Sequence, residues 1–235
     1  MSVFDCSSAD TRAEGLAEAG RALSRGGLVV LPTDTVYGIG ANAFDPGAVA
    51  ALLAAKNRER SQPPPVLVPS PQTLSALTAH VPPIVEELIS QLWPGPLTII
   101  CRSQPTLAWD LGDTAGTVAL RMPDHELALE LLATTGPLAV SSANISQQPA
   151  ATTVLEAATS LGAAVAVYLD DGPSPGGVAS TIVDATGDRL RIVREGALSR
   201  ETLAAIAPEL GEEAEPREGG RRDDGVPPAK GVAAE

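Results

Sequence analysis

Residues 28–38, Leu-Val-Val-Leu-Pro-Thr-Asp-Thr-Val-Tyr-Gly, join an apolar run to a polar loop, and the rest of the chain is interpreted around them. The first four residues follow Gly26-Gly27, a pattern that indicates a buried strand rather than a helix. Polar side chains begin as soon as a proline ends this run. Because binding residues are common where a strand meets its loop, we expect Thr33–Tyr37 to line a site, with the glycines at 38 and 40 leaving room for a ligand.

A short helix after this stretch leads to a cluster of cations. Asp45 is a good N-cap and Pro46 suits the first helical turn, so helix formers that follow predict a helix over 45–55. Three basic residues come next within five positions, Lys56, Arg58 and Arg60. Cations at a helix C-terminus can simply complement the helix dipole in solvent. An anion site is the alternative, and the spacing alone favours neither.

Composition limits the class of protein. The chain has 235 residues, 44% of them hydrophobic, which suits one domain with a sizeable core. No apolar run approaches the ~20 residues that span a bilayer, and the N-terminus lacks a signal-peptide pattern, so we expect a cytoplasmic protein without membrane contact. The two cysteines and two histidines are isolated, which predicts no metal site on the protein.

Charge bears on the partners. The formal net charge is −13, and residues 1–210 alone carry 12 basic against 22 acidic residues. Because binding to a phosphate backbone needs a basic surface, strong direct nucleic-acid binding is not expected.

Strands and helices alternate along the chain, and hairpins enter near its end. Helices are predicted over 8–26, 45–55, a segment from Pro71, 84–92, 126–133, a segment from Thr153, and 199–206. Strands are predicted over 28–31, 66–68, 97–101, 117–120, 137–140, 165–169, 181–183 and 190–193, the last two as a hairpin. Asp124 is expected to cap the helix at 126, and Thr153 to form a capping box with Glu156. This pattern predicts an α/β fold with a twisted mixed sheet.

Two segments read as irregular structure. Glu59–Pro65 is polar and proline-rich, and we expect a mobile loop that covers the site. Near the C-terminal end, Gly, Pro, Glu, Asp and Arg dominate without apolar periodicity. We therefore divide the chain into a folded domain, residues 1–208, and a disordered tail, residues 209–235.

A set of motifs in a fixed order resembles the YrdC-type threonylcarbamoyl-AMP synthases. The motifs are Pro32–Gly38 followed by Lys56-x-Arg58, Trp93–Thr98, Val118–His125, Ser141–Ser146, Ser180–Asp184 and Val193–Gly196. They extend over nearly all of the predicted folded domain, and the chain length is similar to that of the single-domain form. The resemblance implies an open twisted mixed β-sheet flanked by helices, with a concave cationic site.

The resemblance also implies an activity, that of an L-threonylcarbamoyladenylate synthase. Such a nucleotidyltransferase converts L-threonine, bicarbonate and ATP to threonylcarbamoyl-AMP and pyrophosphate, with Mg²⁺ accompanying the ATP. Its product supplies the threonylcarbamoyl modification of tRNA adenosine 37 through a downstream transfer machinery. The implied catalytic residues, which would hold the triphosphate, are Lys56 and Arg58. Further ATP contacts are implied for Ser142, Asn144, Thr152 and Arg194, and threonine contacts for Thr35, Arg121 and Thr181.

Each of these residues also has an ordinary structural explanation. Ser142 and Asn144 are typical turn-capping residues. Arg121 and Arg194 could pair with surface carboxylates, as arginines at strand ends usually do. The functional interpretation is preferred because the residues occur as an ordered set.

Two positions carry expectations of their own. Asp34 is expected to orient its neighbours rather than to act as a general base. Pro69-Ser70 stand where the family often has a threonine-contacting His, so Ser70 or nearby backbone is expected to replace that contact.

Two other functions are compatible with the same fold. A nonenzymatic RNA-binding module would use the cationic face for a phosphate backbone, which the acidic composition disfavours. A carbamoyl-adenylate-forming domain of the hydrogenase-maturation type would take carbamoyl phosphate and usually lies within a much longer multidomain chain.

Overall fold

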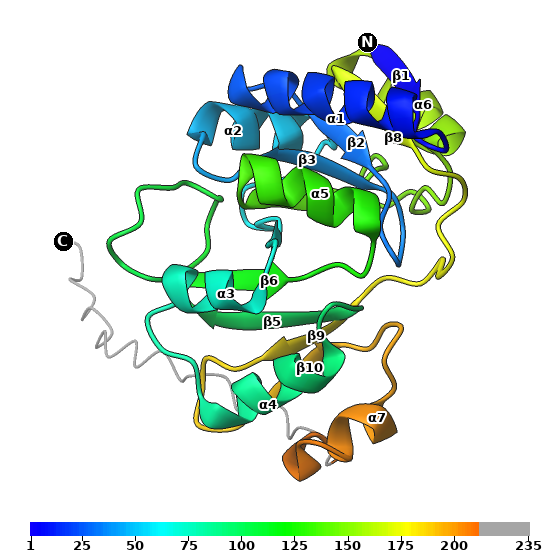
Figure 1. Cartoon of the computed structure of the whole chain (residues 1–235). Helices are drawn as coiled ribbons and strands as arrows, with labels where there is room; N and C mark the ends of the chain where they lie inside the picture. Colours follow the sequence, from blue (N-terminus) through cyan, green and yellow to red (C-terminus); the bar gives the residue numbers. More distant parts are fainter. Residues whose placement is uncertain (212–235) are drawn as a thin grey trace, which may run out of the picture.

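The computed structural model describes residues 1–211, in which ten strands form one open sheet (Figure 1). The strand order is β1-β8-β2-β3-β7-β4-β6-β5-β9-β10. The strands are β1 (Ser2–Asp5), β2 (Val29–Leu31), β3 (Gly38–Asn42), β4 (Val66–Leu67), β5 (Leu97–Arg102), β6 (Thr117–Arg121), β7 (Leu138–Ser142), β8 (Val167–Asp170), β9 (Thr181–Asp184) and β10 (Arg191–Arg194). Parallel pairs such as β5–β9 and antiparallel pairs such as β3–β7 share the sheet, so the predicted mixed sheet is confirmed.

Helices form wherever the sequence predicted them. They are α1 (Ala9–Ser24), α2 (Pro46–Ala55), α3 (Pro71–Leu77), α4 (Pro83–Leu92), α5 (Glu126–Thr135), α6 (Val154–Leu161) and α7 (Arg200–Ala204), with 3₁₀ turns at Gly162–Ala164 and Pro208–Gly211. The local start signals act as expected, because the Asp45 carboxylate accepts the N–H groups of Gly47 and Ala48, and Thr153 forms a capping box with Glu156. None of the helices in residues 1–211 is long and apolar enough to cross a membrane.

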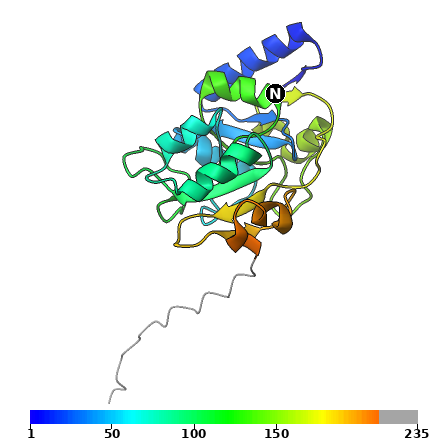
Figure 2. The same cartoon turned by 60° about the horizontal axis from the view of Figure 1, so that its bottom comes forward.

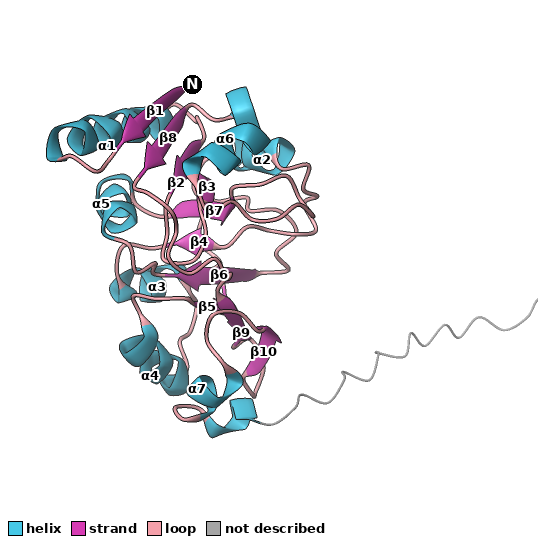
Figure 3. Ribbon diagram, turned by 90° about the vertical axis from the view of Figure 1, so that its right-hand side faces the viewer, coloured by secondary structure: helices cyan, strands magenta, loops and turns pink. Residues whose placement is uncertain are grey.

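The helices pack on the sheet in three groups. Helices α1 and α5 cover one face of the part around β2, β7 and β8, and α2 and α6 cover the other face (Figure 3). Side chains of α3, α4 and α7 form a third core with β5, β6 and β9. Figure 2 shows α7, in orange, beside the β9–β10 end of the sheet. One face of β5, β6 and β9 is left open beside these cores, and the candidate site lies there.

Two strands were not predicted. β1 is a short edge strand, and β3 contains two glycines among five residues, so neither has a strong local β signal. Pairing with β2 and β7 makes residues 38–42 a central strand. The expected role of Gly38 is corrected in part: a Cβ there would lie 2.6 Å from Cγ1 of Val140, so this glycine also permits close packing of β3 on β7.

Two boundary expectations were wrong. The N-cap of α5 is His125 and not Asp124, and its side chain makes no capping bond. Asp124 instead contacts the polar loop, where its backbone N–H donates to Asp34. The folded part also extends beyond residue 208. Leu210 is 1% exposed and packs in the third core, so residues 209–211 belong to the domain rather than to a tail. The rest of the predicted tail, 212–235, lies outside the described residues.

Candidate active site

A cavity of about 330 Å³ opens where the polar loop after β2 meets one face of β5, β6 and β9. Loop 58–65 and the end of β7 complete its walls. Its charged lining residues are three arginines, Arg58, Arg121 and Arg194. No Asp or Glu of residues 1–211 lines the cavity, although the formal net charge of the chain is −13. Three arginines without a carboxylate in the lining suit a multiply charged anion.

Strand alternation determines which side chains reach the cavity. In β5, Thr98 and Ile100 line it, whereas Leu97 and Ile99 are fully buried in the core. β6 runs antiparallel to β5 and ends at Arg121, whose side chain therefore stands at the end of the strand beside the polar loop.

Arg121 is held by three acceptors and is almost fully buried. Its Nη1 donates to Oγ1 of Thr35 at 2.9 Å, its Nη2 to Oδ1 of Asp34 at 2.5 Å, and its Nε to the Gly95 carbonyl at 3.0 Å. Burial lowers the pKa of Arg121, and the neighbouring Asp34 acts against that shift. Asp34 also accepts from the backbone N–H of Asp124 at 3.0 Å, so its contacts are those of a residue that orients neighbours, as expected.

Arg58 lies on the other wall and is held only by neutral oxygens. Its Nε donates to the Gln62 carbonyl at 2.6 Å, its Nη2 to the Pro63 carbonyl at 3.2 Å, and its Nη1 to Oγ of Ser141 at 2.8 Å. Burial lowers the pKa of Arg58, and the positive charge of Arg194 lowers it further. No carboxylate of residues 1–211 forms an ion pair with Arg58, so its charge is available to a ligand.

A β-bulge turns Arg194 toward the cavity. In the β9–β10 ladder Ile192 pairs with Val183, but the register then shifts and Arg194 pairs with Ile182. Ile182 lines the cavity, whereas Val183 belongs to the core. Because opposite residues of antiparallel strands point to the same face, the bulge places Arg194 on the cavity side. Its Nη2 and Nε donate to the Ser180 carbonyl at 2.8 and 3.2 Å.

Lys56 does not line the cavity. The residue is 2% exposed, and its Nζ donates to the carbonyl oxygens of Ser142 and Asn144, each at 2.5 Å. Burial, with a smaller contribution from Arg58, lowers its pKa from 10.5 to about 8. The structure therefore places the Lys56 ammonium on the turn after β7, outside the lining of the cavity.

The remaining predicted ATP contacts separate into two groups. Ser142 lines the cavity, and its hydroxyl has no hydrogen-bond partner within residues 1–211. Asn144 and Thr152 do not line it. The amide of Asn144 donates to the carbonyls of Ile145 and Gln148, and the hydroxyl of Thr152 donates to Glu156, so both side chains have local structural partners.

The two predicted threonine contacts beside Arg121 also differ. Thr35 lines the cavity. Thr181 is fully buried, because the register that pairs it with Leu97 places it on the core face of the sheet. Its hydroxyl donates to the Leu198 carbonyl at 2.7 Å and accepts from the N–H groups of Gly196 and Leu198. Thr181 thus holds the loop after β10 and does not reach the cavity.

Sequence reasoning missed several residues that line the cavity. The most informative are Ser141, which accepts from Arg58, and Ser180, which accepts from Arg194. Both lie next to residues that were predicted, and strand alternation was a usable signal for Ser180. Pro63, Pro64 and Pro65 form one wall, so loop 59–65 covers part of the site as expected. Ser70 stands at the start of α3 and does not line the cavity.

Comparison with known proteins gives this architecture a family. The model of the Sua5/YciO/YrdC family, described as "Telomere recombination", matches residues 21–196. A Mycobacterium leprae protein provisionally named threonylcarbamoyl-AMP synthase is 55% identical over 209 residues, which are 89% of this chain and 94% of that protein. The threonylcarbamoyl-AMP synthase of Bacillus subtilis is 38% identical over 81% of this chain, and the alignment covers 56% of the Bacillus protein.

Solved structures agree with the sequence comparison. The crystal structure of P. abyssi Sua5 complexed with L-threonine has a TM-score of 0.84 and 32% identity, covering 89% of this chain and 62% of that one. Full-length HypF in the phosphate- and nucleotide-bound form has a TM-score of 0.67 at 21% identity, a likeness of fold alone, covering 77% of this chain and 29% of that one. The family match over residues 21–196 and the identity to the Mycobacterium leprae protein along nearly its whole length show that this chain belongs to the Sua5/YciO/YrdC family.

Proposed function

We propose that this chain is an L-threonylcarbamoyladenylate synthase, which converts L-threonine, bicarbonate and ATP to threonylcarbamoyl-AMP and pyrophosphate. The observation that carries the proposal is a cavity lined by three arginines and no carboxylate in a chain of net charge −13. A triphosphate is the kind of ligand that such a lining attracts. Relatives named for this activity, and a related structure that holds L-threonine, support the choice of substrates.

The two ends of the cavity would bind different parts of the substrates. Arg58 and Arg194, whose guanidinium groups contact only neutral oxygens, would bind the triphosphate. The free hydroxyl of Ser142 would donate to a phosphate oxygen. Arg121 and Thr35 would bind the carboxylate of threonine, with Asp34 fixing the direction of the guanidinium.

The reaction needs positioning more than it needs a protein nucleophile. The threonine amine takes up the carbon of bicarbonate with loss of water and gives an N-carboxylate. One oxygen of that carboxylate attacks the α-phosphorus of ATP, the bond from phosphorus to the bridging oxygen breaks, and pyrophosphate leaves with that oxygen. Arginine charge stabilises the transferring and leaving groups. The cysteines offer no rival route, because Cys6 and Cys101 are buried and burial raises the pKa of each thiol to about 11.

Mg²⁺ fits this site as part of the substrate. No group of three or more His, Cys, Asp or Glu side chains within residues 1–211 is placed to hold a metal ion. Mg²⁺ keeps much of its water and binds readily to phosphate oxygens. It would therefore arrive on ATP and reduce the charge that the arginines must meet.

The product defines the partners. Threonylcarbamoyl-AMP is a reactive mixed anhydride, so a transfer machinery must consume it, and we assign that step to the threonylcarbamoyl modification of tRNA adenosine 37 in the cytoplasm. Direct tRNA binding by this chain is not part of the proposal. Filter binding of tRNA across a salt series tests the rival RNA-binding function, which would require tight binding with a steep salt slope.

Pyrophosphate release from Mg·ATP tests the proposed activity. Release should require L-threonine and bicarbonate together, and serine should replace threonine poorly. Carbamoyl phosphate in place of threonine and bicarbonate tests the hydrogenase-maturation type of reaction and should give no release. Pyrophosphate release that is absent, or indifferent to threonine, would contradict the proposal.

A further inference from the structure

The segment that forms the cavity wall beside Arg58 has few backbone N–H donors with which to hydrogen-bond the rest of the protein. Pro63, Pro64 and Pro65 line the cavity, and proline has no backbone N–H to donate. The carbonyl groups of Gln62 and Pro63 accept from the guanidinium of Arg58. Together with Oγ of Ser141, this segment therefore sets the direction of Arg58. The segment is fixed at its C-terminal end, where the Pro65 carbonyl accepts from the N–H of Val140 at 2.8 Å, so its N-terminal end needs a contact of its own.

A second loop, which includes residues 109–113, contacts the segment at Arg60. The carbonyl of Arg60 accepts from the N–H of Asp113 at 2.8 Å, and its guanidinium pairs with Asp110 at 2.8 Å. Gly112 has a φ of +103°, and a Cβ there would lie 2.6 Å from the Arg60 carbonyl oxygen. Only glycine allows so close an approach with this backbone conformation.

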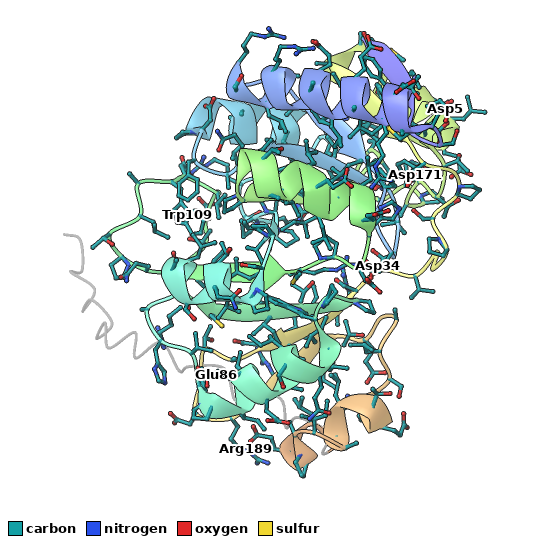
Figure 4. All side chains as sticks on the ribbon, in the orientation of Figure 1. Asp5, Asp34, Glu86, Trp109, Asp171 and Arg189 are labelled. Carbon is teal, nitrogen blue, oxygen red and sulfur yellow. The ribbon has the colours of Figure 1, made fainter. Side chains whose placement is uncertain are left out.

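This second loop is itself anchored. Leu111 is 2% exposed and belongs to the core. The ring of Trp109 stacks on that of Phe44, with centroids 5.5 Å apart and planes at 22°. Phe44 precedes α2 and Arg60 follows it, so the loop contacts the chain at both ends of that helix. Figure 4 shows Trp109 on the side of the molecule opposite to Asp34.

We propose that residues 109–113 form a latch on Arg60, and that the latch holds the 59–65 wall so that Arg58 points at the triphosphate. None of these latch residues lines the cavity, so the latch acts through Arg58, and Arg60 is a positioning residue. The inference rests on the proposed function, because it takes the triphosphate as the ligand of Arg58. The ion pair with Asp110 is solvent-exposed and adds little by itself, so the backbone contact at Gly112 matters most.

Two glycines of the same loop give a matched pair of variants. Gly112→Ala adds a methyl group against the Arg60 carbonyl, and Gly116→Ala adds one where nothing lies within 4 Å. Both glycines have a positive φ, +103° and +75°, so both variants carry backbone strain and only one disturbs the latch. Arg60→Gln, which removes an exposed ion pair without backbone strain, is a third variant in case Gly112→Ala folds poorly.

Two measurements follow the variants in the full-length chain. Hydrogen exchange reports the amide of Asp113, whose N–H donates to the Arg60 carbonyl, and calorimetry with Mg·ATP reports ligand affinity. Gly112→Ala should speed exchange at the Asp113 amide and weaken Mg·ATP binding by about tenfold, because a small misplacement of a binding group is costly. Arg60→Gln should shift both in the same direction by about twofold, and Gly116→Ala should leave both near wild type.

The outcomes separate the latch from the proposed function. If exchange at the Asp113 amide is the same in the two glycine variants, the latch is wrong. If exchange rises in Gly112→Ala while its Mg·ATP affinity matches that of Gly116→Ala, the positioning role is wrong. If wild-type protein does not bind Mg·ATP at all, the proposed function is wrong and the positioning role is overturned with it, whatever the exchange shows.

Discussion

The arginines at the two ends of the cavity differ in whether a carboxylate neutralises their charge. Arg121 is buried, and its Nη2 forms an ion pair with Oδ1 of Asp34 at 2.5 Å. Arg58 donates to two carbonyls and to the hydroxyl of Ser141, all of them neutral. The charge at Arg121 is therefore largely compensated before a substrate arrives, and the charge at Arg58 is not. This difference suits a zwitterionic amino acid at the first end and a polyphosphate at the second.

Lys56 is a third case beside these two. It too donates to neutral oxygens, but it is buried outside the cavity and points at the turn after β7. A buried ammonium without a carboxylate is costly. Lys56 and Arg58 are two residues apart, yet one supports a wall of the site and the other faces the ligand space.

Removal of Arg58 should give the largest effect, because its charge is proposed to bind the triphosphate and no carboxylate of residues 1–211 neutralises it. Hydrogen bonds to charged groups contribute ~1.5–3 kcal/mol each. Arg58→Ala should therefore lower threonine-dependent pyrophosphate release on the order of 100-fold. The control is Arg25→Ala, which removes the exposed arginine that follows α1 and pairs with Glu18 at the surface, and the rate of this variant should stay at the wild-type value. A wild-type rate in Arg58→Ala would show that the triphosphate is not bound there.

Asp34→Asn should leave Arg121 with only neutral hydrogen-bond acceptors, as Arg58 has. The substitution leaves the buried guanidinium without its carboxylate, so the free energy of unfolding in urea should fall by ~1.5–3 kcal/mol. The threonine KM should rise as well, because the guanidinium loses the acceptor that fixes its direction. Sodium sulfate should restore more stability to the variant than to the wild type, since an anion can replace the lost charge. Equal responses to sulfate would contradict a compensated Arg121.

The low pKa of Lys56 predicts a pH effect on stability rather than on the cavity. Because the folded-state pKa is about 8 and the ordinary value is 10.5, the unfolded chain binds more protons than the folded chain between these pH values. The free energy of unfolding due to this group should therefore rise with pH across that window, with a slope approaching ~1.4 kcal/mol per pH unit.

The comparison with Lys56→Met isolates this effect. Cys6 and Cys101 act in the opposite direction above their ordinary pKa of 9, because burial raises each folded-state pKa to about 11. Urea unfolding at pH 8, 8.5 and 9 should show a steeper rise in wild type than in Lys56→Met. Parallel pH profiles would mean that Lys56 keeps its ordinary pKa and is not buried as described.

The smallest effect on substrate binding is expected at Thr181. Its hydroxyl holds the loop after β10 from the core side of the sheet, so Thr181→Val should destabilise the fold by ~1–3 kcal/mol through the unpaired N–H groups of Gly196 and Leu198. The threonine KM should change less than about twofold, since an unchanged Arg121 end keeps its contacts. A large rise in threonine KM with unchanged stability would contradict this prediction and support the direct contact between Thr181 and threonine that the family resemblance implies.

Local chemistry alone was enough for most of the elements. Asp45 with Pro46, and Thr153 with Glu156, specify helix starts through side-chain bonds to nearby backbone, so the start of each of these two helices could be predicted from a few residues. The strands that were not predicted are those without a strong local signal. β3 lacks a local strand signal and exists because β2 and β7 pair with it, which no window of sequence contains.

The sequence by itself determined the family, the mixed sheet and the ordered set of polar residues around it, because these depend on local spacing and on motifs read in order. Only the tertiary structure decided which of those residues share the cavity. The face that a strand residue presents depends on its register with another strand, which puts Thr181 in the core, and a bulge in β10 brings Arg194 round to the open side. A long side chain such as that of Lys56 can turn toward either wall, and the carbonyl oxygens of a distant turn fixed its direction.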